Sequence, residues 1–211
     1  MENPVIILGA NFLGRAAKDV FEANGNVVYG FLDDNKSLHG KEIDDITVLG
    51  STDDDGYLKV IGKKCEVFVA ADEIKLRKNL VQMLQEERHV QPVNAVHPSA
   101  VIAASASIGH GNFIGVSVVE AGAEIGNHCI IHSKALIGVE VKISDYVQVG
   151  AGAVINPGVL VEDEVFIGSG VIIVAGLTIG KGARIGAGSV VIGPVKAGET
   201  VFGNPAEKVN A

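Results

Sequence analysis

The chain has 211 residues, of which 20% are charged and 5% aromatic, with no Trp and a formal net charge of −8. An acidic surface does not attract nucleic acid or anionic membranes, and so few aromatic residues leave no platform for single-stranded bases. The first ten residues include an acidic residue and only a short apolar run, and no run is long enough to span a membrane. We therefore expect a cytoplasmic protein of one or two domains.

The N-terminal segment opens with a strand, turn, helix, strand pattern. An apolar run over residues 5–8 is followed by a helical pattern over 15–23 and a second apolar run over 27–32. The first turn carries Gly9 and Gly14, as the dinucleotide-binding fingerprint does. A βαβ unit of this kind predicts a small parallel sheet with a ligand at the carboxyl ends of its strands.

The fingerprint is incomplete in one respect. Asp33 and Asp34 follow the second strand, where an acidic residue would meet a ribose hydroxyl, but Asn11 replaces the middle glycine. A Cβ at that position hinders the close approach of a pyrophosphate, which disfavours NAD as the ligand.

Further elements complete the N-terminal domain. Strands are expected at 47–50 and 66–71, an amphipathic helix at 75–88, and an extended segment at 93–96 that leads onward. The His-Pro pair at 97–98 favours extended structure and marks a domain boundary. We therefore expect an α/β domain over residues 1–97.

A six-residue period dominates the rest of the chain. Residues 125–196 divide into hexads that each open with Ile or Val, which predicts a parallel β-helix with three short strands per coil. The opening aliphatic residue should point inward, and the Gly, Asn and Asp residues should lie at the corners. Ile114, Ile108 and Ile102 extend the pattern, with one residue deleted between Ile114 and Ile125. Residues 201–206 break the period and should cap the last coil.

These segments together resemble a known family. With GANFLG, GFLDDN, VHPSA, the hexapeptide repeats and VFGNPA, the whole chain is similar to the sialic acid O-acetyltransferase family of left-handed β-helix sugar acyltransferases. The family includes bacterial N-acetyltransferases of nucleotide-linked 4-amino sugars. The resemblance implies a homotrimer, a nucleotide sugar bound by residues 1–97, and acetyl-CoA bound between neighbouring left-handed β-helices of residues 98–211.

The resemblance also implies the binding residues. The positions that match the nucleotide-sugar site are Asn11, Phe12, Leu13, Asp33, Asp34 and Asp72. The positions that match the acetyl-CoA site are Gln148, Gly168, Ser169, Gly186 and Ala187. Several of them differ from the family pattern, which has Gly-His-Gly at residues 12–14, a glycine at Asp72 and a histidine at Gln148.

The catalytic hexad departs furthest from the family. The family has a histidine general base followed by an acid, whereas this chain has Val139 and then Glu140. Acyl transfer needs a proton acceptor of near-neutral pKa, and His132 stands seven residues before Val139, where the family has an asparagine close to the reacting groups. Either His132 is the base, oriented by Glu140 of the same or a neighbouring subunit, or it has a structural or substrate-contacting role.

The remaining titratable residues predict no further chemistry. His110 and His128 fall on adjacent coils as solvated or subunit-contact residues, because a metal site would need a third ligand. Cys65 and Cys129 are isolated and are expected to be reduced thiols.

Three functions remain open. The first is an acyl-CoA-dependent N- or O-acyltransferase, with acetyl-CoA as co-substrate, that acts on a nucleotide-activated sugar for surface glycan synthesis. The second is a trimeric binding protein that has lost the catalytic base, and the third is a sugar-nucleotide enzyme of different chemistry.

Overall fold

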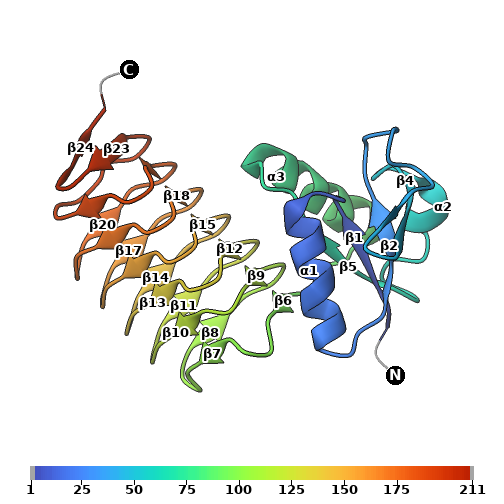
Figure 1. Cartoon of the computed structure of the whole chain (residues 1–211), viewed down its shortest axis with the longest axis horizontal. Coiled ribbons are helices and arrows are strands. Elements are labelled where there is room, and N and C mark those ends of the chain that lie inside the picture. Colours follow the sequence, from blue (N-terminus) through green and yellow to red (C-terminus); the bar gives the residue numbers. More distant parts are fainter. Residues whose placement is uncertain (1–2, 210–211) are drawn as a thin grey trace. The chain divides into compact units, whose positions relative to one another are not determined.

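The computed structural model describes residues 3–209. The chain divides into two compact units, residues 1–98 and 99–211, one residue after the boundary that the sequence predicts. The fold class is confirmed: the first unit is α/β with a mainly parallel sheet, and the second is a left-handed parallel β-helix (Figure 1).

The first unit is built on a five-stranded sheet in the order β3-β4-β2-β1-β5. Its strands are β1 (Val5–Leu8), β2 (Val28–Leu32), β3 (Glu42–Ile43), β4 (Ile46–Gly50) and β5 (Glu66–Val69), and β6 (Ala95–Val96) follows them in the chain. Its helices are α1 (Phe12–Ala23), α2 (Asp55–Leu58), α3 (Ile74–Met83) and the π-helical turn η1 (Leu84–Arg88). All pairs in the sheet are parallel except the hairpin of β3 and β4.

Alternate residues of the strands give the sheet two apolar faces. On one face Phe68 packs against Phe21 of α1, with ring centroids 5.8 Å apart. On the other face Ile6 and Leu8 pack with residues of α2 and α3, including Leu58 and Val81. The helices therefore cover both faces, and the carboxyl ends of β1, β2 and β5 remain available to form a site.

The second unit stacks short parallel strands into three faces. The first face holds β7 (Val101–Ile102), β10 (Val118–Val119), β13 (Leu136–Ile137), β16 (Val154–Ile155), β19 (Ile172–Ile173) and β22 (Val190–Val191). The second face holds β8 (Ser107–Ile108), β11 (Glu124–Ile125), β14 (Lys142–Ile143), β17 (Leu160–Val161) and β20 (Thr178–Ile179). The third face holds β9 (Phe113–Ile114), β12 (Ile130–Ile131), β15 (Gln148–Val149), β18 (Phe166–Ile167), β21 (Arg184–Ile185), β23 (Thr200–Gly203) and β24 (Ala206–Lys208).

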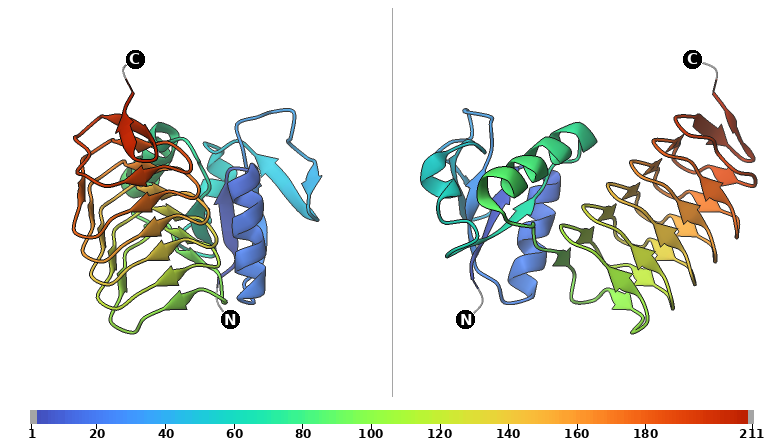
Figure 2. Two further views of the ribbon diagram at one scale, coloured as in Figure 1. Left: turned by 60° about the vertical axis from the view of Figure 1, so that its left-hand side comes forward. Right: turned by 180° about the vertical axis from the view of Figure 1, so that it is seen from behind.

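Turns between the faces form three edges that run along the β-helix. The 1–2 edge follows each first-face strand, the 2–3 edge each second-face strand, and the 3–1 edge each third-face strand. Figure 2 shows these turns aligned along the stack of coils.

The strand registers confirm the hexad frame. Leu136 pairs with Val154, eighteen residues on, but Val101 pairs with Val118, seventeen residues on. The deleted residue therefore belongs to the 3–1 edge between Ile114 and Val119, both of which are buried. The fourth residue of most hexads has positive φ, which explains the glycines there, such as Gly152.

The three faces differ in the side chains that point outward. On the first face these are all aliphatic: Val101, Val118, Leu136, Val154, Ile172 and Val190. The second face is mostly polar and carries an ion pair between Lys142 and Glu124, 3.0 Å long. On the third face the guanidinium of Arg184 lies over the ring of Phe166, 4.7 Å from its centroid.

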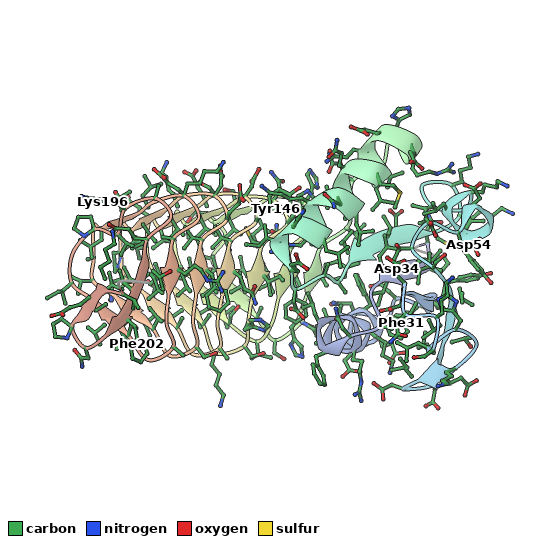
Figure 3. All side chains as sticks on the ribbon, turned by 90° about the horizontal axis from the view of Figure 1, so that it is seen from above. Phe31, Asp34, Asp54, Tyr146, Lys196 and Phe202 are labelled. Carbon is green, nitrogen blue, oxygen red and sulfur yellow. The ribbon has the colours of Figure 1, made fainter. Side chains whose placement is uncertain are left out.

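The C-terminal residues close the last coil. β23 and β24 form an antiparallel hairpin, and Phe202 of β23 lies against Gly186 of the coil before it (Figure 3). Within residues 3–209, none of the helices combines the length and the apolar character needed to cross a membrane.

Candidate functional site

The first βα turn of the α/β unit depends on two glycines. Gly9 has φ +113°, and a Cβ there would overlap the carbonyl oxygen of Ala70 in the segment after β5. Gly14 lies in the first turn of α1, where a Cβ would overlap the carbonyl oxygen of Gly9. The two fingerprint glycines thus bring α1 close to the ends of β1 and β5.

Asn11 completes this turn with its side chain. Its Oδ1 accepts a hydrogen bond from the N–H of Gly14 at 2.9 Å, so Asn11 is the N-cap of α1. Its Nδ2 donates to the carbonyl of Ala70 at 2.7 Å. The residue that replaces the middle glycine of the fingerprint therefore joins α1 to β5.

Asp33 and Asp34 hold the neighbouring loops together. Asp33 accepts the N–H of Ala10 at 2.8 Å, and Asp34 accepts the N–H and hydroxyl of Thr52 at 3.0 and 2.7 Å. These bonds link the segments that follow β1, β2 and β4. Asp33, Asp34 and Thr52 line a small cavity of about 100 Å³, together with Gly9.

The other expected sugar-site residues differ in accessibility. Leu13 is only 3% exposed and packs in the core, so in this conformation its side chain is not on a ligand-accessible surface. Phe12 and Asp72 are exposed at the same end of the sheet. The buried Arg77 donates to the carbonyl of Ala71 at 2.7 Å and so supports the loop that carries Asp72.

The 2–3 edge of the β-helix is occupied by structural interactions. The side chain of Asn127 accepts the N–H of His110 at 2.9 Å, and Asp145 accepts the N–H of Asn127 at 2.7 Å. His128 is buried and stacks on Tyr146, with ring centroids 5.0 Å apart. This ladder ties each coil to the next.

The 3–1 edge carries the residues expected to meet acetyl-CoA. Ser169 and Ala187 are exposed there, whereas Gly168 and Gly186 pack against the backbone of Ala187 and the ring of Phe202 respectively. Those two glycines are therefore required by coil stacking, whether or not a ligand binds. Gln148 points outward from the adjacent third face, between Ile130 and Phe166 in the ladder.

The 1–2 edge carries two carboxylates. Val139 is 38% exposed and Glu140, with φ 56°, is exposed beside it. Glu120, one coil earlier, extends along this edge and accepts the N–H of Val139 at 3.1 Å. Glu120 was not predicted from the sequence, although the coil repeat of about eighteen residues places it one coil before Gly138 on the same edge.

His132 and Glu140 lie on different edges of one chain. His132 follows β12 on the 3–1 edge, near the ring of Phe113 at a centroid distance of 6.2 Å, and Glu140 follows β13 on the 1–2 edge. The first face separates them. The structure does not bring the expected base and its carboxylate together within a single chain.

Comparison with known proteins agrees with this two-part organisation. Residues 4–84 match the model of the PglD N-terminal domain, and residues 158–193 match the model of the bacterial transferase hexapeptide, six repeats. The α/β unit is thus similar to the PglD N-terminal domain, and part of the β-helix is similar to the hexapeptide repeats of bacterial transferases. The resemblance to left-handed β-helix sugar acyltransferases is thereby confirmed.

Solved structures share the fold along the whole chain. A histidine-to-asparagine variant of perosamine N-acetyltransferase from Caulobacter crescentus, in complex with CoA and GDP-perosamine, is 24% identical, with a TM-score of 0.90 over 100% of this chain and 99% of its own. The acetyltransferase domain of PglB from Neisseria gonorrhoeae is 23% identical, with a TM-score of 0.88 over 99% and 100%. WeeI from Acinetobacter baumannii is 27% identical, with a TM-score of 0.87 over 98% and 99%. A search of curated proteins found no match.

Among residues 3–209, no group of three or more His, Cys, Asp or Glu side chains is placed to hold a metal ion.

Proposed function

We propose that this protein is an acyl-CoA-dependent acyltransferase that transfers an acetyl group to an amino or hydroxyl group of a nucleotide-activated sugar, for surface glycan synthesis in the cytoplasm. The observation that carries the proposal is the union of a PglD-type domain with a β-helix that aligns from end to end with an enzyme bound to CoA and GDP-perosamine. The α/β unit would hold the nucleotide sugar, and the β-helix would hold acetyl-CoA.

The aliphatic first face supports a cyclic homotrimer. An outward column from Val101 to Val190 exposes apolar side chains along the β-helix, and closed symmetry would cover it without leaving an open end. If three protomers turn their first faces toward a common axis, the 3–1 edge of each meets the 1–2 edge of the next. The groove between protomers would then be formed by the two edges that carry the candidate residues.

This ring would unite the groups that one chain keeps apart. His132 of one protomer would approach Glu140 and Glu120 of its neighbour, because His132 follows β12, which in chain order lies between β10, which precedes Glu120, and β13, which precedes Glu140. Carboxylates beside an imidazole favour its protonated form, so they raise its basicity. In the transfer step the sugar nucleophile attacks the thioester carbonyl, its proton passes to His132, and the carbon–sulfur bond breaks to release CoA.

A non-catalytic binding protein is the second candidate. It is favoured by the partly exposed Val139 at the position of the family's base, since a valine side chain can neither accept nor relay a proton. Such a protein would bind the nucleotide sugar or acetyl-CoA without turnover.

Two substitutions test the base directly. His132→Ala should lower kcat by about 10²–10⁴-fold, with little change in acetyl-CoA affinity. Val139→His should raise activity at least tenfold by restoring a histidine beside Glu140. Ala175→His is the matched control, because Ala175 is exposed on the same edge two coils further on.

Unchanged kcat in His132→Ala, together with no gain in Val139→His, would refute both base assignments. If the parent also binds acetyl-CoA by isothermal titration but shows no turnover with any nucleotide sugar, the binding-protein function is the correct one.

A further inference from the structure

Phe12 is exposed at the ligand end of the α/β unit. It is the first residue of α1 and is 86% exposed, the largest fraction among the large hydrophobic residues exposed within residues 3–209. Burial of a phenylalanine side chain stabilises a folded protein by about 1.5–3 kcal/mol. The α/β unit does not gain this stabilisation from Phe12. The ring is therefore placed where only something outside the α/β unit can cover it.

A hollow lies beside this ring. Its volume is about 330 Å³, and it is lined by Ala10, Asn11, Phe12, Arg15 and Ile43. Small-ligand pockets begin at roughly this size, about 300 Å³. Apart from the polar ends of Asn11 and Arg15, its walls are an aromatic ring and aliphatic groups.

An ion pair holds together two segments that line the hollow. Arg15 donates from Nε and Nη2 to the two carboxylate oxygens of Asp44, at 2.7 and 3.0 Å. The hydrogen bonds from Arg15 lower the pKa of the Asp44 carboxyl below its usual range. Asp44 lies in the turn between β3 and β4, and the pair thus ties α1 to the hairpin that presents Ile43 to the hollow.

The positive end of α1 adjoins the same hollow. The N–H groups of Phe12 and Leu13 open the helix and have no partner within it, and anions are stabilised at such a position. A ligand that combines an aromatic ring with phosphate groups matches both features together. A second protein chain would need a broader apolar surface than this hollow provides.

We propose that Phe12 is the stacking platform for the base of the nucleotide sugar, with Ile43 as a second apolar residue that lines the same hollow. This inference rests on the proposed function, because it names the group that the α/β unit would recognise. Stacking of a base on an aromatic ring contributes affinity whatever the base is, since every base has a π-face. Phe12 therefore strengthens the binding of any nucleotide, and other residues determine which base is preferred.

Isothermal titration of the full chain with UDP and with GDP tests the platform. Phe12→Ala should lower the affinity for whichever nucleotide the parent binds by about tenfold or more, which corresponds to about 1.4 kcal/mol of binding free energy. Phe12→Tyr should keep the parent affinity, because it keeps the ring. Tyr29→Ala is the control, because Tyr29 is an exposed aromatic residue of the same unit that does not line the hollow.

The outcomes separate this inference from the proposed function. Unchanged nucleotide affinity in Phe12→Ala would overturn the platform alone, as would weaker binding of the nucleotide sugar with unchanged binding of the free nucleotide. A loss of the parent's oligomeric mass in Phe12→Ala would show that the ring packs against protein instead. If the parent binds neither nucleotides nor nucleotide sugars, the proposed function fails, and the platform with it.

Discussion

Val154→Asp tests whether the first face closes the oligomer. Val154 points outward from β16, between Leu136 and Ile172 in the first-face ladder. In a closed trimer three copies would be buried near the axis. Burying a valine contributes about 1.5–3 kcal/mol, and an uncompensated carboxylate in a dry interface costs several kcal/mol, so three copies disfavour the trimer by more than roughly 10 kcal/mol.

This magnitude predicts complete dissociation. At about 1.4 kcal/mol for each factor of ten, 10 kcal/mol lowers the association constant by about seven powers of ten. Light scattering at micromolar concentration should give three times the chain mass of 21.8 kDa for the parent and 21.8 kDa for Val154→Asp.

Leu160→Asp is the matched control. Leu160 is also the outward residue of a two-residue strand, but it lies on the second face, where its side chain is exposed. The Leu160→Asp variant should remain trimeric, and circular dichroism should show a folded β-helix in both variants. A trimeric Val154→Asp, or a dissociated Leu160→Asp with the same spectrum, would refute the assignment of the first face to the interface.

Three further substitutions test other parts of the molecule. Glu120→Gln and Glu162→Gln each weaken one hydrogen bond that a backbone N–H of the next coil donates to the carboxylate, 3.1 and 2.7 Å long, so both variants should lose about 1 kcal/mol or less of stability in urea unfolding. Only Glu120→Gln should also lower kcat and shift the pH–rate profile, and equal activity in the two variants would contradict a role for Glu120 beside the base. Gly14→Ala should cost about 1–3 kcal/mol, because the added methyl group overlaps a backbone carbonyl, whereas a gain in stability would show that α1 can move away. Ala187→Trp should weaken CoA binding in calorimetry without changing the oligomeric mass, and parent-like affinity would exclude the 3–1 edge as a wall of the groove.

The β-helix could be predicted from the sequence because each short strand carries its own signal. The opening position of every hexad from Ile125 onward is aliphatic, and the deletion before Ile125 was visible as a break in the period. The strand at 47–50 was predicted and corresponds to β4, but β3 and α2 were missed, because elements of two and four residues are too short to show a period. The turn at Asp44 and Asp45 also uses positive φ without glycine, so the usual glycine signal of a tight hairpin turn is absent from the sequence.

The site was harder to predict because it depends on how the coils stack and on which polar side chains already have hydrogen-bond partners within the fold. Glu120 reaches Val139 only because successive coils lie in register, a relationship that a search along neighbouring residues does not detect. Asn11 was expected to contact the substrate, but its amide is used as a helix cap and as a bridge to Ala70. Residue type indicated the polar groups at each position, and only the fold determined which of them were already bonded.

The most direct test of the proposed function is an acetyl-transfer assay with the parent protein. Acetyl-CoA is mixed with a panel of UDP-, dTDP- and GDP-linked amino sugars, and the release of free CoA thiol is followed together with the mass of the sugar nucleotide. An acyltransferase predicts that at least one sugar nucleotide gains an acetyl group in step with CoA release, and that no release occurs without the sugar. Acetyl-CoA binding with no acetylated product from any member of the panel would contradict the proposed function.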